Sequence, residues 1–134
     1  MINIMDEFGR NAGAVWKTLN VHGPLPETRL MELTKLHEDE FHAAVGWLAR
    51  ENKICKTGSV YKLGETNLTT KIGESAGKLW KILETHGTFD TTDLSTWAQI
   101  EERDAYTALG WLARENKIEA KTSIPKEYQI KRSP

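Results

Sequence analysis

The nine-residue stretch GWLARENKI occurs twice in this chain, at Gly46–Ile54 and again at Gly110–Ile118. Adding 64 to each residue number aligns the first half of the chain with the second, and no gap is needed from Gly9 to Ile54. Beyond that point, Tyr61 aligns with Tyr128 only if three residues are inserted in the second copy. Self-similarity at one fixed spacing indicates a repeated structural unit, and insertions collect in surface loops.

The chain therefore holds two copies of one unit, which we place at residues 1–64 (repeat 1) and 65–134 (repeat 2). The polar stretch Gly64–Lys71 joins them. A unit of about 60 residues is near the lower limit for an independent hydrophobic core. We therefore expect the two repeats to pack against each other.

Each repeat has the pattern of three helices followed by a β-hairpin. In repeat 2, apolar residues at helical spacing predict helices around Ile72–Leu83, Leu94–Ile100 and Ala105–Leu112. Strand-like runs follow at Ile118–Lys121 and Glu127–Lys131. Repeat 1 has the same order of elements. The predicted fold class is α+β, mainly α, with two tandem winged helix-turn-helix domains of three helices and one hairpin wing each.

The motifs KIGESAGKLWKILETHG and ALGWLARENKI resemble a small prokaryotic winged helix-turn-helix family of uncharacterised function. Repeat 1 carries the same motifs as FGRNAGAVWKTLNVHG and AVGWLARENKI, so the resemblance covers nearly the whole chain, twice. The resemblance implies the fold and no established activity. Known members carry one such domain, and the tandem form departs from that pattern.

Most winged helices bind DNA by placing the third helix in the major groove and the wing on the backbone. A helical wheel places one face of the third helix outward, comprising in repeat 1 Asp39, His42, Ala43, Gly46 and Arg50. The candidate nucleic-acid contacts on the third helices and wings of both repeats are Arg50, Lys56, Arg103, Tyr106, Thr107, Arg114, Lys121 and Lys126.

The charge pattern argues against simple DNA recognition. The chain has a formal net charge of −1, and the third helix of repeat 1 begins with Glu38, Asp39 and Glu40. These carboxylates stabilise a helix amino terminus through its dipole, but they also repel phosphate. Repeat 2 is the better candidate because Arg103 lies in its first turn. Lysines on the wings fit phosphate contact, and they equally fit protection of an exposed sheet edge.

A glycine followed by a tryptophan recurs inside both third helices, as Gly46-Trp47 and Gly110-Trp111. Glycine inside a helix costs about 1 kcal/mol relative to alanine, and a close backbone approach would offset that cost. Aromatic residues and arginine are enriched in interface cores. These four residues therefore form a candidate interface that joins the repeats or binds another protein. The alternative is that each Trp packs against its own wing.

No enzymatic motif is present in the sequence: it contains no glycine-rich phosphate loop, no HExxH and no CxxC. His37 and His42 are five residues apart, which is poor ligand spacing. We therefore expect no catalytic residues, no metal and no cofactor. The single cysteine, Cys55, cannot form an internal disulfide, and no run of apolar residues approaches membrane-spanning length. These features favour a cytoplasmic, non-membrane protein.

Two functional classes remain open from the sequence. One is a nucleic-acid-binding module in transcriptional regulation that contacts double-stranded DNA mainly through repeat 2 and its wing. The other is a protein-interaction module that uses the Gly-Trp patch and binds DNA little or not at all. The fold analogy favours the first class, and the charge favours the second. The sequence identifies neither a target nor an oligomeric state.

Overall fold

The computed structural model describes residues 3–131, so the outermost ends of the two predicted repeats lie outside the described residues. The elements of repeat 1 are α1 (Ile4–His22), β1 (Leu25–Pro26), α2 (Glu27–Thr34), α3 (Glu38–Arg50), β2 (Ile54–Thr57) and β3 (Val60–Leu63). Those of repeat 2 are α4 (Thr69–His86), β4 (Phe89–Asp90), α5 (Thr91–Ala98), α6 (Glu102–Arg114), β5 (Ile118–Ala120) and β6 (Glu127–Ile130). The predicted fold class, mainly α with two winged helix-turn-helix units, is confirmed.

Local sequence signals explain where the long helices begin and end. The side chain of Asn3 accepts a hydrogen bond from the backbone N–H of Met5 at 3.1 Å and so caps the start of α1. The first helix of each repeat ends at a glycine with positive φ, +79° at Gly23 and +101° at Gly87. Glycine adopts this conformation without the steric cost that a side chain would add.

Each wing is part of a three-stranded antiparallel sheet rather than an isolated hairpin. The strand orders are β1-β3-β2 and β4-β6-β5, so a two-residue strand from the segment between the first two helices pairs with the last strand. Leu25 pairs with Tyr61 and Phe89 pairs with Tyr128. The short strands attach each wing to the helices of its own repeat.

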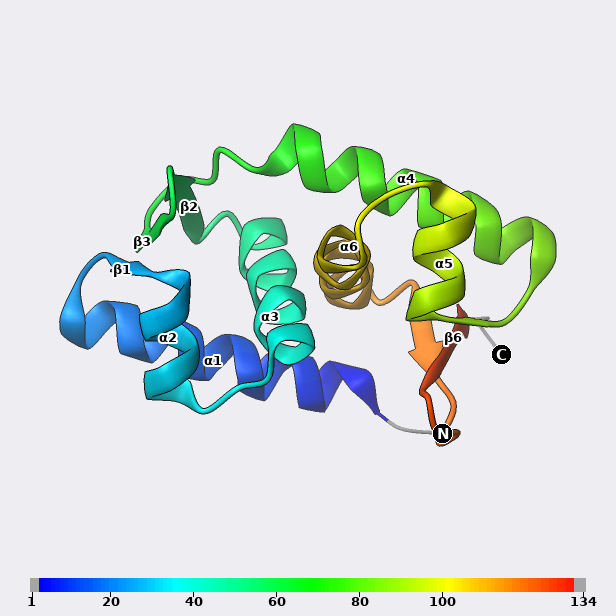
Figure 1. The fold of residues 1–134 in the computed structure, drawn as a ribbon, viewed down its shortest axis with the longest axis horizontal. Helices are drawn as coiled ribbons and strands as arrows, with labels where there is room; N and C mark the ends of the chain where they lie inside the picture. Colours follow the sequence, from blue (N-terminus) through cyan, green and yellow to red (C-terminus); the bar gives the residue numbers. More distant parts are fainter. Residues whose placement is uncertain (1–2, 132–134) are drawn as a thin grey trace.

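The two repeats share one core. Helices α3 and α6 lie side by side at the centre of the molecule, with α1 and α4 along the outside (Figure 1). One continuous cluster of buried apolar side chains includes residues of both repeats, among them Phe41, Val45, Leu79 and Leu109. The repeats thus pack against each other, as their small size predicts. No helix in the described part of the chain is long and apolar enough to cross a membrane.

Candidate functional site: the paired third helices

Helices α3 and α6 approach so closely that their backbones touch. A Cβ atom placed on Gly46 would lie 1.8 Å from the carbonyl oxygen of Thr107, and one placed on Gly110 would lie 1.9 Å from that of Ala43. These contacts are reciprocal, because Gly46 aligns with Gly110 and Ala43 with Thr107 at the repeat spacing of 64. Reciprocal contacts of this kind are the property of a two-fold interface. The repeats are therefore arranged like the subunits of a symmetric dimer.

This packing corrects the outward face that the helical wheel assigned to the third helix. His42 is 3% exposed, Ala43 is 2% exposed, and Gly46 is also buried. In repeat 2 the aligned Gly110 is buried as well. The wheel was wrong for these central residues because it considered one repeat alone, where this face has no partner. In the complete chain the third helix of the other repeat covers Ala43 and Gly46, whereas Asp39 and Arg50 at the two ends of the face are exposed, as expected.

Arginines extend the contact at the carboxyl ends of the paired helices. Arg50 Nε donates to Glu115 Oε2 at 3.0 Å, and Arg114 Nε donates to Glu51 Oε2 at the same distance. These two ion pairs are also exchanged by the 64-residue spacing. Both arginines, which the sequence offered as nucleic-acid contacts, therefore bind carboxylates of the opposite repeat.

The tryptophans of the Gly-Trp pairs lie beneath these arginines. The guanidinium carbon of Arg114 is 5.6 Å from the ring centroid of Trp47, and that of Arg50 is 5.5 Å from the ring centroid of Trp111. Both distances fit cation–π contacts. Trp47 also packs over α1, because a Cβ atom placed on Gly9 would be 3.4 Å from the ring. The structure thus brings the four candidate interface residues together between the repeats.

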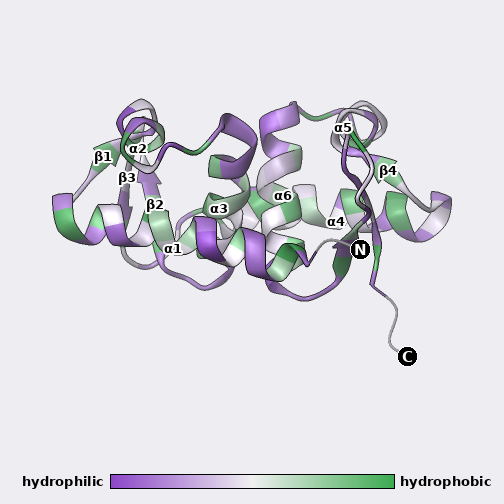
Figure 2. Ribbon diagram, turned by 90° about the horizontal axis from the view of Figure 1, so that it is seen from below, coloured by the Kyte–Doolittle hydropathy of each residue, from purple (hydrophilic) through white to green (hydrophobic). Residues whose placement is uncertain are grey.

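The amino-terminal ends of α3 and α6 point to the same edge of the molecule, beside α2 and α5 (Figure 2). They share a surface recess lined by Glu38, Asp39, Glu102, Arg103 and Tyr106. Arg103 is the single cationic residue among these, and its Nε is 3.9 Å from Glu101 Oε2. Burial raises the pKa of Tyr106, and the nearby carboxylate of Glu102 raises it further. This edge is therefore acidic, which is unfavourable for contact with phosphate.

The remaining candidate nucleic-acid residues are only partly brought together. Lys126 Nζ binds Glu7 Oε1 of repeat 1 at 3.0 Å, and Thr107 Oγ1 donates to a backbone carbonyl of its own helix. Lys56, Arg103 and Thr107 line one pocket, which lies between the repeats. Lys121 is exposed on the wing of repeat 2. The structure thus brings three of the candidates to one pocket, while Lys121 and Lys126 lie outside its lining.

The structure also shows a surface that the sequence reading missed, a shallow groove of about 330 Å³ between α4 and α5. Its lining residues are Lys78, Lys81, Ile82, Thr85, His86, Trp97 and Ala98. Trp97 is 53% exposed, although helical spacing had grouped it with the buried Leu94. Its ring lies 4.4 Å from that of His86, centroid to centroid. Helical spacing could not have shown this exposure, because Leu94 and Trp97 lie three residues apart and therefore fall on the same side of the helix.

Comparison with known proteins bears on the fold alone. No curated protein and no solved structure matches the chain. The winged helix-turn-helix domain family DUF2582 matches residues 4–63 and, separately, residues 67–130. These two matches cover most of the described residues and follow the two repeats. The chain therefore belongs to the winged helix-turn-helix domain family DUF2582, as a tandem pair of its domains.

Proposed function

We propose that this protein is a non-enzymatic protein-interaction module in which two winged helices form one closed unit. The observation that carries this proposal is the burial of the third-helix face. A DNA-reading winged helix presents that face to the major groove. Here Gly46 and Gly110 lie against the backbone of the opposite repeat. Entry into a groove would require the repeats to separate.

The Gly-Trp patch has the role of joining the repeats in this proposal. Glycine permits the close approach, and the tryptophans, covered by arginines of the opposite repeat, supply apolar contact area. Arg50 and Arg114 add ion pairs with Glu115 and Glu51 to this interface between the repeats. These groups are therefore occupied within the chain and are not offered to a partner.

The partner surface that we propose is the groove between α4 and α5. Its exposed Trp97 provides an apolar platform, tilted against the ring of His86 and 5.5 Å from the ring of Phe89. Lys78 and Lys81 line the same groove. An exposed aromatic residue flanked by positive charge complements an acidic protein segment that carries one apolar anchor residue. The aligned positions of repeat 1 place Ala14 and Leu33 where repeat 2 has Lys78 and Trp97, so only repeat 2 offers this combination.

Selection from a displayed library of random peptides tests the proposal. We expect the intact protein to enrich acidic peptides that contain a large apolar residue. Trp97→Ala and Lys78→Glu should each weaken a selected peptide by at least about tenfold, as loss of a binding hot spot does. Trp16→Ala is the matched control, because Trp16 is also exposed, at 39%, but lies on α1. Enrichment of peptides that bind all three variants equally well would contradict the groove as the partner site.

Nucleic-acid binding through the wings is the second candidate. It is favoured by Lys62 and Lys121, which are exposed and form no ion pair with any acid of residues 3–131. A labelled random-sequence duplex should be titrated at about 20 mM and about 200 mM salt, because phosphate contacts weaken steeply with salt. Steep salt dependence that is lost in Lys62→Glu or Lys121→Glu would support this candidate over the protein-interaction module. Absence of duplex binding at the lower salt concentration would exclude nucleic-acid binding through the wings.

A further inference from the structure

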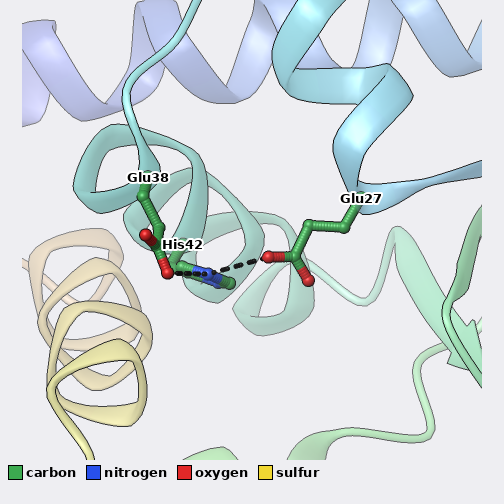
Figure 3. A group of neighbouring side chains, drawn as sticks. All are labelled: Glu27, Glu38 and His42. Atoms are coloured by element: carbon green, nitrogen blue, oxygen red, sulfur yellow. Dashed lines mark ion pairs between the residues drawn. The ribbon is translucent and has the colours of Figure 1, made fainter.

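Three potential metal ligands meet where α2 and α3 begin. Glu27 is the first residue of α2, Glu38 is the first residue of α3, and His42 lies one turn further along α3 (Figure 3). His42 Nε2 is 3.3 Å from Glu27 Oε1 and 3.9 Å from Glu38 Oε1. One ligand atom of each residue lies within 4.8 Å of the other two.

The imidazole supplies a second and independent observation. The His42 side chain is 4% exposed, and its buried Nε2 atom makes no hydrogen bond, although Glu27 Oε1 at 3.3 Å is within ion-pair distance. The two carboxylates flank this nitrogen on either side, as Figure 3 shows. Buried polar side-chain atoms in folded proteins nearly always have a partner, so an unsatisfied one calls for an explanation. In the tautomer whose Nε2 carries no proton, this nitrogen and the two carboxylates beside it are suited to bind a cation.

Repeat 2 shows that the fold does not require this cluster. The positions aligned with Glu27, Glu38 and His42 are Thr91, Glu102 and Tyr106. There the phenol of Tyr106 donates a hydrogen bond to Glu102 Oε1 at 3.4 Å, and no buried nitrogen is left without a partner. The same scaffold thus carries a hydrogen-bonded pair in repeat 2 and three potential metal ligands in repeat 1.

We propose that Glu27, Glu38 and His42 bind one divalent transition-metal cation of the zinc type. Imidazole nitrogen with carboxylate oxygen is a ligand set that zinc accepts, at about 2.0–2.2 Å from each atom. Ligand atoms around one tetrahedral ion are then about 3.4 Å apart. His42 Nε2 and Glu27 Oε1 are 3.3 Å apart, which is close to this value. Glu38 must move inward, and its side chain is 65% exposed and has room to do so.

The surrounding charges are compatible with this site. The carboxylates of Glu27 and Glu38 together balance the charge of a divalent cation, whereas Lys56 and Arg103 near His42 act against it. Three protein ligands leave a fourth position for water. The bound ion would connect the start of α2 to the start of α3. The sequence search missed the site because it compared histidines with one another, whereas the other two ligands are carboxylates.

Calorimetric titration of the metal-stripped, full-length protein with Zn²⁺ tests the proposal. We expect one ion per chain with micromolar affinity and a rise in melting temperature. Glu27→Gln and His42→Tyr should each weaken binding by at least about tenfold, because even the loss of an outer-shell partner of a metal ligand costs about 10–100-fold. His42→Tyr installs the residue that repeat 2 carries at this position. His22→Asn is the control, because His22 is exposed at the end of α1.

Co²⁺ absorption gives a second readout that does not depend on stability. Ligand-field bands at the intensity of a tetrahedral site should appear in the wild type and disappear in Glu38→Gln, a change at a largely exposed side chain that the fold tolerates. The proposal is overturned if Zn²⁺ does not bind at submillimolar concentration. It is also overturned if binding survives in His42→Tyr and Glu38→Gln, or is lost in His22→Asn.

Discussion

Gly46 faces the carbonyl oxygen of Thr107 so closely that a methyl group on Gly46 would lie 1.8 Å from that oxygen. The clash would be with backbone, which cannot rotate away as a flexible side chain can. The aligned contact between Gly110 and Ala43 is equally close. The two glycines therefore determine how near the third helices, and hence the two repeats, can come.

Gly46→Ala should destabilise the protein even though alanine is the better helix former. Overpacking a well-packed interior typically costs about 1–3 kcal/mol, and a backbone clash places this change at the upper end. The measurement is the free energy of unfolding from urea titration. Gly77→Ala is the matched control, because Gly77 is a helical glycine with no atom within 4 Å of an added Cβ. That change should stabilise by roughly 0.5–1 kcal/mol. Equal effects of the two substitutions would contradict the close contact.

Repeat 1 expressed alone, as residues 1–64, should form a homodimer. Its third helix would expose an apolar face, and the reciprocal contacts of Gly46 with Ala43 and of Arg50 with Glu51 can be remade with a second copy. Sedimentation analysis should show a dimer that dissociates on dilution. Gly46→Ala in this fragment should shift the equilibrium to the monomer. A folded monomer at high concentration would show that the paired arrangement depends on the tandem linkage.

The Arg50–Glu115 ion pair should contribute modestly to stability. The two side chains are 45% and 17% exposed, so solvent screens their attraction. A double-mutant cycle with Arg50→Gln and Glu115→Gln should give a coupling energy of about 0.5–1 kcal/mol at low salt. Because the pair is partly exposed, the coupling should decrease in high salt. A coupling that is unchanged by salt would indicate that the direct hydrogen bond between Arg50 Nε and Glu115 Oε2, rather than screened charge attraction, dominates.

Tyr128 should make the protein less stable in alkali. Burial raises the pKa of the Tyr128 phenol, and the carboxylate of Glu7 raises it further. In the unfolded chain the phenol ionises near pH 10, whereas the folded protein keeps the proton. Stability from this group is therefore fully present below about pH 10 and falls as the pH rises above it, by about 1 kcal/mol between pH 10 and 11.

Urea titrations of wild type and Tyr128→Phe at pH 8, 10 and 11 check this expectation, because phenylalanine has no ionisable group. The difference in unfolding free energy between the two proteins should change in favour of the variant as the pH rises. A difference that stays constant across this range would mean that the folded protein ionises Tyr128 as readily as the unfolded chain does.

The repeat and its elements could be read from the sequence because they depend on local patterns. Helical spacing and helix-ending glycines such as Gly87 are patterns among neighbouring residues. The duplication follows from comparing the two copies of GWLARENKI directly. The short strands β1 and β4 were less evident, because a two-residue strand has no periodicity of its own. Their pairing partners, Tyr61 and Tyr128, are distant in the chain.

The sequence by itself determined the fold of each repeat, the duplication and the unusual glycines inside the third helices. Only the tertiary structure decided which surface those helices present. Whether His42 and Gly46 face solvent or another helix depends on contacts between residues more than 60 positions apart. The periodicity of a local sequence window carries no information on such contacts. The same packing between the repeats pairs Arg114 with Glu51, and convergence of α2 and α3 within repeat 1 brings Glu27 beside His42. Close approach of two backbones and convergence of separate helix ends are properties of the folded chain, because they arise only when distant segments share one core.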